Sequence, residues 1–227
     1  MKLGFLGTGN ISSDVISGIC KSRLNINKIY ISPRNRKKAN SLKRKYKGKI
    51  IIAKNNQEVI DKSTWVFLGV IPNIGKKILP SLKFRSNQTI ISFISTIKYH
   101  ELKKITNIKA SIFRAIPMPP ISLGKGPIAL YPPNKKVKSF FDKIGTCIEI
   151  KSEQLSNNFW AISGTMASFY ELLKVLSDWL VKKGLKRSDA QKYTISLYSA
   201  LAELASINSS QNLKKFVLNS QTPGGLN

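Results

Sequence analysis

Histidine, cysteine and acidic residues are scarce in this chain of 227 residues. The single histidine is His100, and the two cysteines are Cys20 and Cys147. A zinc site built from His and Cys ligands is not expected from so few of them, and we predict no metal centre. A Ser-His-Asp hydrolase would depend on His100 alone. Two cysteines cannot form a disulfide framework, which favours a reducing, cytoplasmic location.

Long apolar runs are also missing. No stretch approaches the roughly 18 consecutive apolar residues of a membrane-spanning helix. The opening residues 1–7 are too short and too rich in glycine for the apolar part of a signal peptide. Hydrophobic residues still make up 42% of the chain, enough to bury a core. The sequence therefore predicts one large or two small globular domains with no membrane partner.

The charge is strongly unbalanced, with 11 acidic against 38 basic residues and a formal net charge of +27. Such a balance is typical of proteins that bind nucleic acid or another anionic surface. Lysine, however, outnumbers arginine 31 to 7, and Lys, Ile, Asn, Phe, Tyr and Met, which have A/T-rich codons, supply 97 of the 227 residues. Nucleic-acid sites favour arginine for bidentate contacts. We therefore attribute the charge mainly to codon bias and expect no nucleic-acid partner, although a nucleic-acid-associated protein stays open as an alternative.

Short apolar runs alternate with longer polar stretches of helical periodicity over residues 1–151. Strands are predicted at 2–6, 28–32, 49–53, 65–70, 89–94, 109–115, 126–131 and 146–150, and helices at 10–23, 35–47, 73–82, 98–104 and 135–144, with a short one near 56–61. Strand–helix alternation of this kind predicts an α/β fold, a doubly wound parallel sheet with helices on both faces.

The pattern changes over residues 152–227, where strand-like runs stop and an all-helical domain is predicted. One long helix is expected over 156–183 with a bend at Gly164, followed by helices over 188–208 and 212–219. The second of these is apolar on more than one face, through residues such as Ile195, Leu197 and Leu201. A lone pair of helices cannot cover that surface, so we expect a homodimer or higher homo-oligomer through the C-terminal helices.

A glycine-rich turn, Gly7-Thr8-Gly9-Asn10-Ile11-Ser12, follows the first predicted strand and opens the first predicted helix. It resembles G-x-G-x-x-G with Ser12 at the third glycine. The first glycine permits the tight turn, and the second lets the backbone approach a pyrophosphate that lies on the helix N-terminus. Residues 7–11 are therefore predicted to bind a dinucleotide, and residues 1–151 to form a Rossmann-like domain.

The second predicted strand ends in Ser32-Pro33-Arg34-Asn35-Arg36 and carries no acidic residue. NAD-binding proteins usually have Asp or Glu at this point to hold both ribose hydroxyls. A hydroxyl and an arginine suit the 2′-phosphate of NADP instead. Ser32 and Arg34 are therefore predicted to favour NADP, and NADPH over NADH.

Several blocks together resemble the pyrroline-5-carboxylate reductase family along nearly the whole chain. VFLGVIP (66–72) is similar to its V-K-P segment and RAIPMPP (114–120) to its R-x-M-P-N-x-P. SGTMASF (163–169) resembles S-G-S-G-P-A-Y, with LKRSDA (185–190) following, and TPGGLN (222–227) resembles S-P-G-G-x-T. FLGTGNISSDVISGI and ISPRNRKKANSL resemble the family's opening and the segment after its second strand. The order and spacing of the blocks are more specific than any single block.

The resemblance implies a Rossmann-like NADP-binding domain, residues 1–151, and a helical dimerisation and substrate domain, residues 152–227. It implies NADPH-dependent reduction of a cyclic imine, 1-pyrroline-5-carboxylate to L-proline, the last step of proline biosynthesis. It adds Asn56, Val70 and Pro72 to the cofactor site. It assigns Ser163, Gly164, Thr165, Gly224 and Gly225 to the substrate carboxylate, and Asn227 to the position of a threonine that meets the imine nitrogen.

This chain also departs from the family pattern. The lysine of V-K-P is Ile71, and the asparagine of M-P-N is Met118. Met166 and Ala167 replace the second glycine and the proline of S-G-S-G-P-A-Y. The family continues for another helix, so the chain is expected to be short at its C-terminus. These departures leave two alternatives open, namely a nucleotide-binding homologue with weak or no catalysis, regulatory or scaffolding in role, and a reductase of a different imine.

Overall fold

The computed structural model describes residues 1–106 and 110–221. It divides the chain into two compact units, Met1–Trp160 and Ala161–Asn227. The functional domains expected at 1–151 and 152–227 stay a prediction, because compactness alone does not delimit an NADP-binding or a dimerisation domain.

The first unit is built on one sheet of eight strands. They are β1 (Lys2–Leu6), β2 (Lys28–Ile31), β3 (Ile50–Ile52), β4 (Trp65–Leu68), β5 (Thr89–Ser92), β6 (Ser111–Pro117), β7 (Pro127–Tyr131) and β8 (Thr146–Glu149). Their order across the sheet is β3-β2-β1-β4-β5-β6-β7-β8. The chain therefore moves outward from β1 to β3 and then crosses back to β4, so the order reverses between β1 and β4. In open α/β sheets, ligands bind at the carboxyl ends of the strands beside such a reversal.

One pair of strands departs from the predicted parallel sheet. β7 is antiparallel to β6, with Arg114 opposite Tyr131 and Pro117 opposite Ile128. All other neighbouring strands are parallel. The link between β6 and β7 holds only a short 3₁₀ helix, η2 (Pro119–Leu123), whereas a parallel crossover needs about a dozen residues or more. The expectation of a purely parallel sheet is therefore wrong at β6–β7, and the sheet is mixed.

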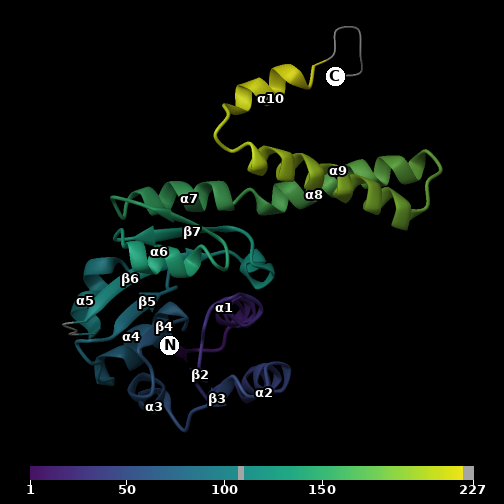
Figure 1. Cartoon of the computed structure of the whole chain (residues 1–227). Coiled ribbons are helices and arrows are strands. Elements are labelled where there is room, and N and C mark those ends of the chain that lie inside the picture. Colours follow the sequence, from purple (N-terminus) through teal and green to yellow (C-terminus); the bar gives the residue numbers. More distant parts are fainter. Residues whose placement is uncertain (107–109, 222–227) are drawn as a thin grey trace. The chain divides into compact units, whose positions relative to one another are not determined.

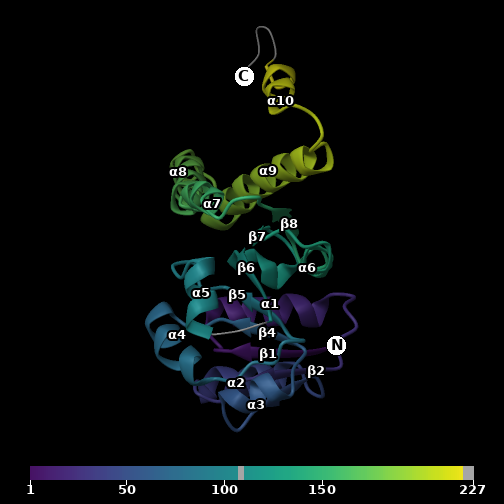
Figure 2. The ribbon, with the colours of Figure 1, turned by 90° about the vertical axis from the view of Figure 1, so that its left-hand side faces the viewer.

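Helices cover both faces of the sheet, as a doubly wound fold requires (Figures 1 and 2). The helices of the first unit are α1 (Asn10–Lys21), α2 (Arg36–Lys45), α3 (Asn56–Asp61), α4 (Pro72–Ile78), the 3₁₀ helix η1 (Leu79–Ser81), α5 (Tyr99–Thr106) and α6 (Lys135–Phe141). One apolar core joins the sheet to α1, α2 and α6, and a second core joins it to α3, η1 and α5. The α/β, doubly wound fold class is confirmed.

Strand β4 shows how the two cores are formed. Its side chains alternate between the faces, so Trp65 and Phe67 enter one core while Val66 and Leu68 enter the other. All four are buried, as the uninterrupted apolar run predicts for a central strand. Phe67 is fully buried and stacks on Phe5 of β1 at a ring-centroid distance of 4.5 Å.

The remaining helices are α7 (Leu155–Ser163), α8 (Met166–Lys182), α9 (Arg187–Ile207) and α10 (Leu213–Asn219). The single helix expected over 156–183 is wrong, because it is two helices separated at Gly164 and Thr165. The amide of Gly164 donates to Ala161 O at 3.2 Å and that of Thr165 to Ile162 O at 3.0 Å. These bonds reach back three residues, so the end of α7 tightens into a 3₁₀-type turn and α8 starts afresh.

Helix α1 lies unusually close to the end of β4. Ser12 of α1 is fully buried, and its hydroxyl has no hydrogen-bond partner in the described part of the chain. A Cβ placed on Gly69, directly after β4, would overlap Ser12 Oγ. Ser12 occupies the third glycine position of the turn, where a glycine permits close packing. Gly69 therefore supplies the space that Ser12 takes up.

We predict that Gly69→Ala destabilises the protein by about 1–3 kcal/mol, because the added methyl group overpacks a filled site. Ser12→Gly should restore a large part of this loss in the double variant, since it removes the overlapping hydroxymethyl group. Urea denaturation of the wild type, both single variants and the double variant gives the coupling free energy, which we expect to be about 1–2 kcal/mol. Additive losses in the double variant would contradict the packing described here.

Candidate functional site

A hollow of about 690 Å³ opens at the carboxyl ends of β1, β2 and β4, beside the reversal of strand order. Its lining comes from the β1–α1 turn, the β2–α2 turn, the start of α3 and the β4–α4 segment. The residues are Gly7, Thr8, Gly9, Ser32, Arg34, Asn35, Arg36, Asn56, Gly69, Val70, Ile71, Ile74, Lys77 and Ile78. Seven of the ten residues predicted to bind the cofactor are among them, so the structure brings most of that set together.

Gly7 fixes the course of the β1–α1 turn. Its φ is +96°, a left-handed conformation that residues with a side chain rarely adopt. A Cβ here would also lie 2.6 Å from the carbonyl oxygen of Gly69. The amide of Gly7 donates to Ser32 Oγ at 3.1 Å, which ties the turn to the end of β2. Glycine is therefore required at this position by the fold itself.

The next part of the turn leaves space and hydrogen-bond donors for an anion. Gly9 caps α1 with φ of −64°, and a Cβ there would meet only Gly69 O, at 3.8 Å. Neither the backbone conformation of Gly9 nor its neighbours require glycine at this position. The space that a side chain would fill is open, and it belongs to the hollow that Gly9 lines. The first turn of α1 has no acidic residue and no side-chain cap, and buried Thr8 Oγ1 has no partner among the described residues. Amides at such a helix start suit a pyrophosphate, and these residues fit a dinucleotide.

Ser32 connects three segments at the end of β2. Its buried hydroxyl accepts the Gly7 amide hydrogen bond and donates to Asn56 Oδ1 at 2.7 Å, with Phe5 O also 3.2 Å away. Asn56 is the first residue of α3, and Asn55 caps that helix by accepting from the amide of Glu58 at 2.9 Å. The serine thus orders the wall of the hollow through the bonds it makes within the chain.

Arg34 and Arg36 are exposed at the same edge, where β2 leads into α2. The first turn of α2 carries Arg36, Lys37 and Lys38 and no acidic residue. Cations at a helix N-terminus oppose the helix dipole, at a cost of typically about 0.3–1 kcal/mol each. Helix stability therefore does not account for this cluster, whereas cations at the edge of a hollow suit an anionic ligand.

Lys38 differs from its neighbours because it has partners within the chain. Its ammonium donates to Asn10 Oδ1 of α1. Burial raises the pKa of the Asp14 carboxyl, also in α1, and the positive charge of Lys38 lowers that pKa in part. Lys38 therefore links α1 to α2, while Arg34 and Arg36 stay free of ion pairs among the described residues and face the hollow.

Three predicted cofactor residues do not line the hollow. The side chain of Asn10 accepts a hydrogen bond from Lys38, and Ile11 packs against the apolar core, so both side chains have partners within the protein. Pro72 is the first residue of α4, where its missing N–H is not needed. Neighbouring Ile71 does line the hollow and is 65% exposed.

Sequence reasoning missed several lining residues, chiefly Gly69, Ile74, Lys77 and Ile78. Gly69 directly follows β4, and a glycine at the end of a strand beside a predicted site was the available signal. Lys77 and the two isoleucines lie on α4, and they reach the hollow only because the strand order brings β4 next to β1. No sequence motif marks them.

The predicted substrate residues belong to the second unit. Ser163 ends α7, and Gly164 and Thr165 link α7 to α8. Thr165 is exposed, and its hydroxyl donates to Ile162 O at 2.7 Å. Gly224, Gly225 and Asn227 lie outside the described residues. The substrate roles of all six therefore stay predictions.

Among residues 1–106 and 110–221, no three His, Cys, Asp or Glu side chains gather where they would hold a metal ion. Nor does any helix described there have the length and apolar character needed to span a membrane.

The chain is similar in sequence to known proteins. Residues 2–96 match the model of the family described as NADP oxidoreductase, coenzyme F420-dependent. Pyrroline-5-carboxylate reductase 3 of Danio rerio is 25% identical over 202 residues, which cover 85% of this chain and 69% of that protein.

Two solved structures share the fold. Pyrroline-5-carboxylate reductase of Streptococcus pyogenes superposes with a TM-score of 0.80 at 23% identity, covering 99% of this chain and 86% of that one. The Plasmodium falciparum pyrroline carboxylate reductase with NADP bound gives 0.81 at 23% identity, covering 100% and 86%. The chain is therefore similar over most of its length to pyrroline-5-carboxylate reductases in sequence, and it shares the fold of the two solved structures.

Proposed function

We propose that this protein reduces a cyclic imine with NADPH, converting 1-pyrroline-5-carboxylate to L-proline in the last step of proline biosynthesis. The observation that carries the proposal is the hollow at the strand-order reversal. There the glycine-rich turn, the Ser32–Asn56 hydrogen bond and the arginines after β2 line one cavity of about 690 Å³.

The preference for NADPH over NADH rests on the charges at the end of β2. Residues 32–38 contain four cations and no acidic residue. A carboxylate there would repel the 2′-phosphate of NADPH, whereas the Arg34 and Arg36 guanidinium groups pair with it.

The chain's contribution to the reaction is binding and orientation. NADPH, when bound, supplies the hydride that adds to the imine carbon. The start of α1 holds the pyrophosphate through its free amides, and Ser32 and Asn56 keep the walls of the hollow in place. Val70 and Ile71 give that cavity an apolar side. An imine that arrives protonated already carries the proton its nitrogen keeps, so no acid–base pair is required.

The substrate residues are proposed from the family resemblance. Amide and hydroxyl groups of Ser163, Gly164 and Thr165, with Gly224 and Gly225, hold the carboxylate of the imine, since successive N–H groups of a glycine-containing turn suit an anion. Asn227 takes the threonine position and hydrogen-bonds the imine nitrogen.

A homodimer through the C-terminal helices is proposed from the surface of the second unit. Apolar side chains on α9 are exposed in a stripe of helical spacing, Tyr193, Leu197, Leu201 and Leu204, with exposed fractions of 64, 44, 51 and 51%. A stripe this apolar is typical of a surface covered by a partner subunit. We propose a cytoplasmic location, because both cysteines are free thiols, as is usual in a reducing compartment.

A nucleotide-binding homologue with weak catalysis is the second candidate. Ile71 stands where the resemblance expects a lysine, and it is an exposed part of the hollow's lining. Met118 similarly replaces an expected amide. Both changes remove polar groups from the region where the imine would react.

The first test is oxidation of NADPH, followed at 340 nm, with 1-pyrroline-5-carboxylate and with a six-membered cyclic imine. We expect turnover of the five-membered substrate, faster with NADPH than with NADH. Turnover of only the six-membered imine would make this a reductase of another substrate. NADPH binding with no turnover of either imine would favour the binding homologue.

Removal of one guanidinium tests the 2′-phosphate site. Arg34→Ala should raise the Kd for NADPH about tenfold or more and leave the Kd for NADH unchanged, because only NADPH carries the 2′-phosphate. Fluorescence titration measures both constants. The matched control is Arg23→Ala, an exposed arginine after α1 with the same loss of charge. Equal weakening of both cofactors by Arg34→Ala would contradict this role.

The apolar stripe of α9 gives the test of the dimer. Leu197→Glu should convert the protein to monomers, because a carboxylate cannot be buried in an apolar interface without a partner. Ser199→Glu, on the polar side of the same helix, should leave the dimer intact. Analytical ultracentrifugation measures both, and circular dichroism confirms that the helices persist. Dimers that survive Leu197→Glu would place the interface elsewhere.

A further inference from the structure

Basic residues are unusually dense in one segment next to the candidate cofactor site. Residues 34–54 contain ten lysines and arginines and no acidic residue. The other 206 residues contain the remaining 28 basic and all 11 acidic residues. Codon bias explains why lysine is chosen over other polar residues, but it does not explain why about every second residue of this segment is a cation, against about one in seven in the rest of the chain.

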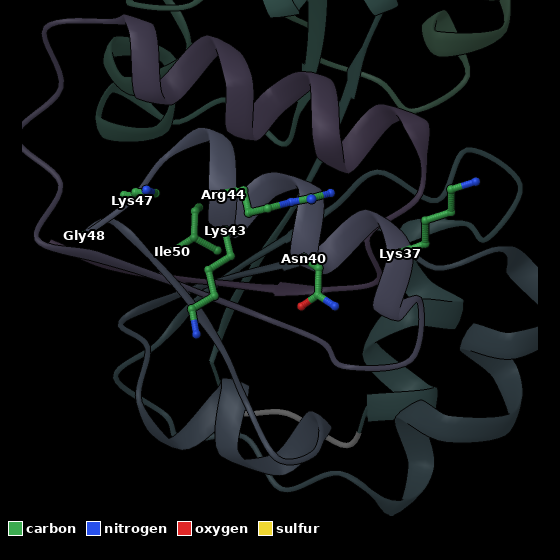
Figure 3. A pocket seen from close by; sticks show the side chains of 7 residues that line it. All are labelled: Lys37, Asn40, Lys43, Arg44, Lys47, Gly48 and Ile50. Carbon is green, nitrogen blue, oxygen red and sulfur yellow. The ribbon is translucent and has the colours of Figure 1, made fainter.

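Helix α2 presents these charges on its outer face. The buried residues of α2 are Ala39 and Leu42, whereas Lys37, Lys43 and Arg44 are exposed, as is Lys47 just beyond its end. These four cations, with Asn40, Gly48 and Ile50, line a shallow hollow of about 570 Å³ (Figure 3). No acidic side chain in residues 1–106 and 110–221 forms an ion pair with any of the four.

The side chains on this face do not converge on a point. Figure 3 shows Lys37 and Lys47 at opposite ends of the helix, with Lys43 and Arg44 extending in different directions between them. A compact anion would therefore not be chelated here. Charges arranged in this way act through their summed field, which extends over about 10 Å at an ionic strength of 0.1 M.

The basic face continues directly into the candidate cofactor site. Arg36 lines the cofactor hollow, and the next residue, Lys37, lines the hollow on α2. Lys43 and Arg44 follow about 10 Å further along the helix, at 1.5 Å per residue. The molecule that enters the cofactor hollow is, under the proposed function, a dinucleotide with an anionic pyrophosphate and an anionic 2′-phosphate.

We propose that the basic face of α2 (Lys37, Lys43, Arg44 and Lys47) steers NADPH into its site and raises the association rate constant. This inference rests on the proposed function, because it names the entry surface of that same site. Steering accelerates encounter with an oppositely charged ligand and falls steeply with salt. Lys43, Arg44 and Lys47 do not line the cofactor hollow, so the rate of dissociation should not depend on them.

The test compares two triple variants that change the net charge equally. Lys43→Glu/Arg44→Glu/Lys47→Glu reverses the basic face. The control, Lys125→Glu/Lys135→Glu/Lys143→Glu, reverses three exposed lysines beside β7, α6 and β8. Strand β8 lies five strands from β1 across the sheet, about 24 Å away at 4.8 Å per strand. Rapid mixing with NADPH and with NADH, followed by cofactor fluorescence, gives both rate constants.

At an ionic strength of about 10 mM we expect the α2 variant to bind NADPH about tenfold more slowly, with an unchanged dissociation rate constant. The loss should be smaller for NADH, which lacks the 2′-phosphate, and should nearly vanish at about 0.5 M salt. The control variant should lose less than about twofold. An equal loss in the control, or a change confined to dissociation, would overturn the proposal.

The two proposals fail in different ways. A wild-type protein that binds neither cofactor would refute the proposed function, and the steering with it. A wild-type protein that binds NADPH, with an association rate constant that the α2 variant leaves unchanged, would refute only the steering.

Discussion

The close contact between the β1–α1 turn and the end of β4 is the constraint on which the first unit depends. The strand order reverses here, so the turn must pass over the end of β4 to start α1. A side chain on Gly7 would meet Gly69 O at 2.6 Å, and a side chain on Gly69 would overlap Ser12. Because the two glycines remove both clashes, α1 can begin directly at the carboxyl ends of β1 and β4. The start of α1 then lies beside the cavity that Gly9, Ser32 and Asn56 line.

Basic residues stabilise helix α2 at its C-terminal end and destabilise it at its N-terminal end. Lys43, Arg44 and Lys45 lie in its last turn, where they favour the helix dipole, but Arg36 and its two neighbours oppose the dipole at the other end. The helix tolerates this because Asn35 caps it, accepting from the amide of Lys38 at 3.1 Å, and because Leu42 is buried. Packing and capping therefore hold cations in a place that suits an anionic ligand better than the helix itself.

Much of the fold was predictable because its signals are local. A buried run such as Trp65–Leu68 and a glycine-rich turn after a strand each specify their own conformation. The site could be predicted as far as it consists of such turns, which is why Gly7 and Ser32 were predicted and do meet. Asn56, which Ser32 contacts, was assigned to the site only through the family resemblance. The antiparallel β7 was missed, because strand direction depends on the length of the preceding link and not on the strand's own residues.

The remaining features depend on distances that a sequence does not contain. Gly69 matters only because α1 passes over it, and Lys77 reaches the cavity only because β4 lies beside β1. The role of the α2 lysines also depends on the fold. In the sequence they are part of a chain in which lysine is frequent throughout. On the folded helix they form a continuous positive face, without acidic partners, that begins at the edge of the cofactor hollow. Their effect on a charged ligand therefore comes from where the fold places them more than from how many there are.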